Sequence, residues 1–184
     1  MHALAEQRRQ GMPTGAVSVK PGDVSPPHYV TLPARAEQCA VKDVDFEECG
    51  AVDVLTLTLA DGRRVGLAGI DTSQLKLNQP VADKAVGYAK RRCCHDVAYL
   101  KFEPSEDGNG ADRPGHLKAQ VWVKEMGGSV LCVNEGLVEA GYASVCRSGK
   151  SQTTCNRTTL VFLQQQARRA RLGIHGDDPR RRER

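Results

Sequence analysis

An acidic residue beside a hydroxyl residue, Asp71-Thr72, follows the most regular strand pattern of the chain. Leu55, Leu57 and Leu59 alternate with small or polar residues, which is typical of a half-buried strand. Asp61-Gly62 then predicts a two-residue hairpin turn with positive φ at both positions. The returning strand ends at Asp71-Thr72, where a carboxylate and a hydroxyl leave the sheet together. We expect Asp71 to cap the following loop, and metal binding is the alternative.

A second candidate, Cys93-Cys94-His95, suggests a metal site, but adjacent cysteines do not easily share one tetrahedral zinc and the chain has no CxxC pair. We expect buried or helix-end thiols here. The seven cysteines are odd in number and scattered, and no apolar signal segment follows Met1. These features predict free thiols, no disulfide-linked partner and an intracellular, preferably cytoplasmic, location. A mitochondrial or other organellar location is the alternative.

Basic residues concentrate near the C-terminus. The formal net charge is +4, and residues 157–184 hold eight arginines against three acids, which leaves the rest of the chain close to neutral. Such a basic segment predicts an anionic partner, such as RNA, DNA or an acidic protein surface, and the other interpretation is a solvated face. The candidate nucleic-acid-binding residues are Arg168, Arg169, Arg171, Arg180, Arg181 and Arg182. No apolar run approaches the length of about 18 residues that a membrane helix needs.

The pattern of elements predicts one domain with two extensions. Residues 1–35 contain five prolines and are expected to form an N-terminal arm, residues 36–176 the folded domain, and residues 177–184 a basic tail. Single strands are expected at 36–48, 96–103 and 117–123, a two-stranded hairpin at 55–71, and helices at 81–94, 130–143 and 160–172. Only 4% of residues are aromatic, so the core must be mainly aliphatic. This order predicts an α+β fold, a small antiparallel barrel with three helices packed outside.

Five stretches in this order, LTLTLADG, VGLAGIDT, GHLKAQVWV, VNEGLVEAGYA and QQARRARLGI, resemble the staphylococcal-nuclease (thermonuclease-like) family, which is also repeated in Tudor-SN proteins. The resemblance covers about residues 37–176. It implies a five-stranded OB-type antiparallel β-barrel with three helices. It also implies an active site like that of a calcium-dependent phosphodiesterase. There two Asp and a Thr carbonyl hold the ion, a Glu activates water, and two Arg bind the phosphate.

Carried over by position, the resemblance keeps one metal-ligand Asp as Asp71 and the Thr as Thr72. The catalytic Glu becomes Gln74, whose amide is no useful base. The two phosphate-binding Arg become Gly66, which has no side chain, and His116, which is a weaker phosphate ligand than a guanidinium.

The other metal-ligand Asp falls on Val54, and Asp53 is one residue away. An offset of one residue turns a strand side chain to the opposite face, unless a bulge restores it. Arg63, Arg64 or Arg113 could supply a guanidinium from neighbouring positions.

These substitutions favour a catalytically degenerate nuclease-like domain that acts as a binding or assembly module. Its expected partner is RNA or a protein or ribonucleoprotein complex, bound through the N-terminal arm and the basic tail. We expect no cofactor, and Asp71 and Thr72 would be a vestigial metal site. The alternative is an active calcium-dependent phosphodiesterase with a rearranged site. A purely structural subunit is the third hypothesis.

Overall fold

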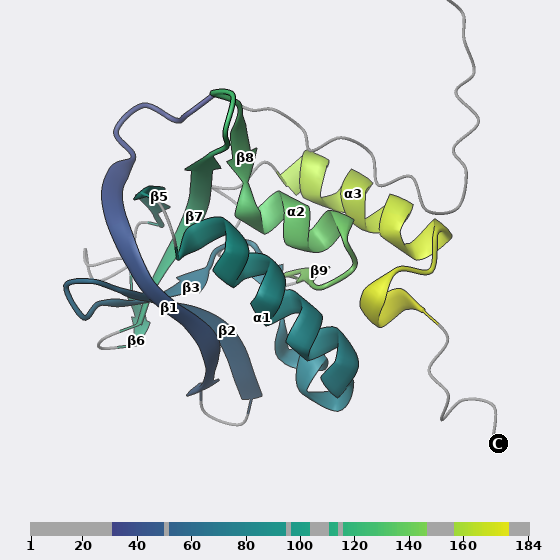
Figure 1. Ribbon diagram of the computed structural model, residues 1–184. Coiled ribbons are helices and arrows are strands. Elements are labelled where there is room, and N and C mark those ends of the chain that lie inside the picture. The colour runs from purple at the N-terminus through teal and green to yellow at the C-terminus, as the bar shows by residue number, and fades with distance from the viewer. Residues whose placement is uncertain are drawn as a thin grey trace, which may run out of the picture.

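The computed structural model describes residues 31–49, 52–94, 97–103, 111–113, 116–146 and 157–176. The strands are β1 (Glu37–Cys49), β2 (Val52–Leu59), β3 (Arg64–Leu67), β4 (Ile70–Asp71), β5 (Val97–Phe102), β6 (Ala111–Arg113), β7 (His116–Lys124), β8 (Val130–Cys132) and β9 (Ser144–Val145). The helices are α1 (Gln79–Cys93), α2 (Val133–Glu139) and α3 (Arg157–Arg169), with short 3-10 helices η1 (Ser73–Leu77) and η3 (Gly173–His175). In Figure 1 most strands lie on the left and α1, α2 and α3 on the right.

Five strands pair in a ring, which confirms the predicted α+β, OB-like class. β1 pairs with β2, β2 with β3, β3 with β7, β7 with β5, and β5 returns to β1. Four of these pairings are antiparallel and β3–β7 is parallel, a contact that the prediction of an antiparallel barrel did not include. β6 and β8 both add to β7, and β4 pairs with β9 in a separate two-stranded sheet.

The alternation of leucines in β2 places them in the core as predicted. Leu55, Leu57 and Leu59 are each at most 1% exposed, whereas Thr58 between them is partly exposed. Val65 and Leu67 of β3 are buried on the same side. The core is built mainly from valine, leucine and alanine, because the chain has few aromatic residues to bury.

The hairpin between β2 and β3 differs from the predicted two-residue turn. Only Gly62 has positive φ, at +88°, and the connection runs over four residues. Gly62 N–H donates to Leu59 O at 3.0 Å, and Arg63 N–H donates to the Asp61 carboxylate at 3.0 Å. The Asp61 side chain replaces a backbone acceptor, which stabilises this longer turn without left-handed backbone at Asp61.

The helix predicted over 130–143 is shorter at both ends, because its first residues form a strand and α2 already ends at Glu139. Val130, Leu131 and Cys132 pair with the end of β7, and α2 begins only at Val133. An apolar run this short is compatible with a helix or a strand, and here it forms a strand because it pairs with the edge of β7. The other two helices lie within three residues of their predicted bounds.

A backbone contact between two glycines fixes the end of α2 against the segment after α3. Gly141 and Gly173 both have positive φ, and Ile174 N–H donates to Gly141 O at 2.8 Å. A Cβ added at Gly173 would lie 2.1 Å from Gly141 O, so only glycine allows this approach. This contact joins the stretches VNEGLVEAGYA and QQARRARLGI, which come last in the predicted domain.

No helix in the described part of the chain is long and apolar enough to cross a membrane. The predicted tail at 177–184, and residues 1–30 of the predicted N-terminal arm, lie outside the described residues.

Candidate functional site

Asp71 and Thr72 both bind backbone groups. The Asp71 carboxylate accepts a hydrogen bond from Ser73 N–H at 2.9 Å. Thr72 is 4% exposed, and its hydroxyl accepts a hydrogen bond from Leu55 N–H of β2 at 2.9 Å. Asp71 therefore makes the cap expected of it, and Thr72 ties this loop to the middle of β2.

The residue at position 66 lies in the sheet next to this exit. Gly66 pairs with Thr56 of β2 on one side and with Lys118 of β7 on the other. It alternates with the buried residues Val65 and Leu67 and is itself partly exposed. We call the surface that carries Thr56, Gly66 and Lys118 the outer face.

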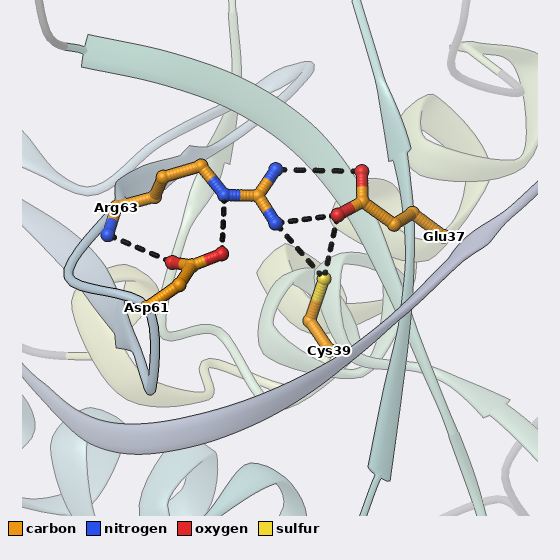
Figure 2. Close-up of polar contacts among 4 residues, drawn as sticks. All are labelled: Glu37, Cys39, Asp61 and Arg63. Atoms are coloured by element: carbon orange, nitrogen blue, oxygen red, sulfur yellow. Dashed lines mark hydrogen bonds and ion pairs between the residues drawn. The ribbon is translucent and has the colours of Figure 1, made fainter.

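Arg63 belongs to a polar cluster at the start of β1, shown in Figure 2. Its guanidinium pairs with both oxygens of Glu37 and, through Nε, with Asp61 at 2.7 Å. It also contacts the Cys39 sulfur at 3.6 Å and lies 5.4 Å from the centre of the Phe102 ring. Through these contacts Arg63 connects β1, the hairpin turn and β5.

The contacts in this cluster shift the pKa values of its two acids and of its thiol. The hydrogen bond from Arg63 lowers the pKa of Glu37, and the backbone and side-chain hydrogen bonds from Arg63 lower the pKa of Asp61. Burial and the neighbouring Glu37 raise the pKa of the Cys39 thiol. The thiol is therefore held protonated, which argues against a reactive cysteine at this place.

Arg64 lies on the outer face and forms an ion pair with Glu47 of β1 through Nη1. Two adjacent arginines thus have separate carboxylate partners. Both were sequence candidates for a substitute phosphate ligand, and each is already engaged by an acid of β1. Arg113, the third candidate, is in β6, and its side chain lies outside the described part of the chain.

Comparison with known families agrees with the OB-like α+β fold that the strand pairing shows. The profile of the family described as staphylococcal nuclease homologue matches residues 64–177. The chain belongs to this family. The match begins at β3, so β1 and β2 are placed by the structure rather than by the profile. No curated protein matches the chain.

Of the four positions to which the resemblance assigns functional groups, Val54, Gly66 and His116 lie in strands of the ring and Gln74 lies in η1. Val54 is half-buried in β2 and pairs with Glu47. Gln74 is exposed in η1, and Gly66 and His116 are in β3 and β7. His116 pairs with Arg64, and its side chain lies outside the described part of the chain. The assignment of these roles stays a prediction.

Asp53 keeps an uninterrupted register with β1. Asp53 pairs with Glu48 and Val54 with Glu47, and the one register shift between β1 and β2 lies at Val41/Asp43. No bulge therefore restores the offset at Asp53 within this ladder. Asp53 stands two positions before Leu55, whose N–H meets Thr72, so β2 runs close to the Asp71-Thr72 exit.

The donors around Asp71 suit a calcium ion poorly. Calcium takes six to eight oxygen ligands. One Asp71 oxygen accepts Ser73 N–H, the Thr72 carbonyl oxygen accepts Leu75 N–H at 3.0 Å, and Val54 supplies no side-chain oxygen. Within the residues that the structure describes, no three His, Cys, Asp or Glu side chains gather as metal ligands. We therefore derive no catalytic step through a metal ion.

The basic surface predicted at the C-terminal end is partly described. Arg168 and Arg169 end α3 and Arg171 follows it, and all three are exposed. Arg180, Arg181 and Arg182 lie outside the described residues. Cys93, whose burial raises its pKa to about 12, and Cys94 are free thiols at the end of α1, as expected for that motif.

Two residues outside the candidate catalytic positions fix segments near the site through side-chain hydrogen bonds. The Asn134 side chain, fully buried, accepts from Val121 N–H and donates to Ala68 O, both at 2.9 Å. Gln164 of α3 accepts from Val145 N–H at 2.7 Å, which fixes β9 beside β4. A polar residue inside the predicted helix favours the interpretation that Asn134 fixes a neighbouring segment by hydrogen bonds, which its contacts confirm, whereas no sequence signal marks Gln164.

Proposed function

We propose that this staphylococcal nuclease homologue is a catalytically degenerate domain that binds nucleic acid or a ribonucleoprotein within a larger complex. The observation that carries the proposal is that each described position examined as a source of a phosphate-binding guanidinium either has no side chain or already pairs with an acid. Gly66 has no side chain, and Arg63 and Arg64 are each paired with carboxylates. Removing one charge-stabilising group typically lowers a rate by orders of magnitude, and here several are absent together.

The capping role of Asp71 supports the same proposal. A carboxylate that holds a backbone N–H serves the fold without any metal ion. The exposed Arg168, Arg169 and Arg171 offer cations to an anionic partner. We further propose that the N-terminal arm and the basic tail add contacts to that partner, and that the free thiols belong to a reducing compartment.

The rival function is that of an active calcium-dependent phosphodiesterase with a rearranged site. The passage of β2 beside Thr72 favours it, because Asp53 then stands near the Asp71 exit along the strand. A cleavage assay on single-stranded DNA and RNA, with added calcium and with a chelator, separates the two. We expect no chelator-sensitive cleavage. Cleavage that both chelator and Asp71→Asn abolish would establish the enzyme instead.

Binding is tested separately from cleavage. The intact chain should bind single-stranded DNA or RNA at low salt and lose affinity as salt rises. Removal of residues 177–184 should weaken this binding, and the same removal should release any nucleic acid that co-purifies with the chain. Absence of binding even at low salt would leave a purely structural subunit as the better description.

A further inference from the structure

Helix α3 carries the one phenylalanine that the fold leaves in water. Two of the three phenylalanines, Phe46 and Phe102, pack against the core, whereas Phe162 is 52% exposed. The helix packs on α2, β9 and η3, and in Figure 1 α2 lies between it and α1. A single exposed apolar side chain is ordinary on a protein surface, so the meaning of this ring depends on its neighbours.

The exposed side of α3 is polar except for this ring. Its buried side consists of aliphatic and small residues, namely Leu160, Leu163 and Ala167. The exposed positions Thr158, Phe162, Gln165 and Arg169 are spaced by four, three and four residues, so they form one stripe opposite the buried side. The ring is thus flanked by a hydroxyl, an amide and a guanidinium. An apolar partner surface would need a wider apolar patch than this stripe offers.

The same helix is cationic. Its 13 residues contain no Asp or Glu, and Arg168 and Arg169 end it. Burial and the charge of Arg168 lower the pKa of His175, which places Arg168 toward η3. No acid in the described ranges forms an ion pair with Arg169. A second copy of α3 would bring no acid to these arginines, so the charge favours an anionic partner of another kind.

We propose that the exposed side of α3 binds a single-stranded nucleic acid, with one base stacked on the Phe162 ring and a phosphate bound by Arg169. This inference rests on the proposed nucleic-acid-binding function and assigns the helix that performs it. Seven residues separate the two side chains, about 10 Å along the helix axis. That distance spans about three nucleotides of a stacked strand.

The chemistry of the stripe suits a nucleotide better than an acidic peptide. Every base has a π-face that stacks on an aromatic ring, so one isolated ring is a sufficient contact and does not select a sequence. Gln165 lies between Phe162 and Arg169 and offers an amide donor and acceptor to a base edge. An acidic peptide would pair with the guanidinium but would find no apolar surface beyond the single ring.

Fluorescence anisotropy of labelled single strands of about 12 nucleotides measures the affinity of the intact chain at about 50 and 200 mM salt. Oligo(U) and oligo(dT) represent RNA and DNA. Phe162→Ala should weaken binding at least about fivefold and leave the salt dependence unchanged, because no charge is lost. Arg169→Gln should weaken binding and make the slope of log affinity against log salt shallower by about 0.7.

Two probes separate stacking from charge attraction. Inorganic polyphosphate carries phosphates without bases, so Arg169→Gln should weaken its binding and Phe162→Ala should not. Phe162→Trp adds an exposed indole to the buried Trp122, and oligo(U) should quench the added emission when a base stacks on it. Polyphosphate should leave that emission unchanged.

Lys84→Gln is the matched control, because it removes an exposed cation from a different helix, α1. It should leave the affinity unchanged. If the wild type binds and Phe162→Ala binds equally well, the inference fails while the proposed function stands. If the wild type binds neither strand at low salt, both fail. Tighter binding of oligo-glutamate than of either strand would make an acidic protein surface the partner and would overturn the inference.

Thermal melts of each variant verify that the affinity changes do not arise from unfolding. Phe162, Arg169 and Lys84 are all exposed, so their substitution should leave the melting temperature close to that of the wild type.

Discussion

Substituting Asn134 by alanine should destabilise the domain strongly, because this buried side chain connects three segments. Its oxygen accepts from Val121 N–H, and its nitrogen donates to Ala68 O at 2.9 Å and to Ala119 O at 3.3 Å. A buried polar group that loses its partner costs about 1–3 kcal/mol. With the Val121 donor and the Ala68 acceptor both affected, the free energy of unfolding should fall by about 3 kcal/mol.

Urea denaturation followed by tryptophan fluorescence measures this change directly. The single tryptophan, Trp122, is 6% exposed and lies one residue from Val121 in β7. The midpoint of thermal unfolding should fall by about 6–12 °C. Because Ala68 leads from β3 to Asp71, the loss should also loosen the backbone at the exit of the sheet.

Asn78→Ala is the matched control. Asn78 precedes α1, but its side chain makes no capping hydrogen bond. Its substitution should change the free energy of unfolding by less than about 0.5 kcal/mol. A loss below about 1 kcal/mol in Asn134→Ala, or one equal to that of the control, would refute the assignment of Asn134 as a connector of the core.

Three further predictions follow from particular contacts. Gly141→Ala should lower stability by about 2–4 kcal/mol, because its Cβ would lie 2.3 Å from the Leu172 carbonyl oxygen at a φ of +71°; an unchanged urea midpoint would contradict this. Arg63→Gln should lose stability at neutral pH but not in acid. The folded-state pKa of its partner Glu37 is lowered, so the stabilisation is present above the ordinary carboxyl pKa and fades as pH falls through the lowered value. Unfolding curves of wild type and variant should therefore converge in acid, and a constant gap would count against the ion pair. Cys93 should resist a thiol-labelling reagent in the native state, because burial raises its pKa to about 12; mass spectrometry of the labelled peptides measures this, and rapid labelling would show that the end of α1 opens.

The local patterns that the sequence determined are those set by neighbours along the chain. The alternation of Leu55, Leu57 and Leu59 needs only a two-residue period to define a strand with one buried face. Pro80 near the start of α1 acts through its fixed φ, and Gly173 after α3 acts through its freedom to adopt positive φ. The capping bond of Asp71 spans two residues, so it too could be anticipated from sequence.

The tertiary structure decided what depends on partners far along the chain. Val130–Cys132 became a strand because β7 offered it an open edge. Arg63 and Arg64 are indistinguishable as residue types, yet one joins Glu37 and the other reaches Glu47 across β2. Alternation places adjacent side chains on opposite faces, but only the pairing of β1, β2 and β3 fixes which acid each arginine meets.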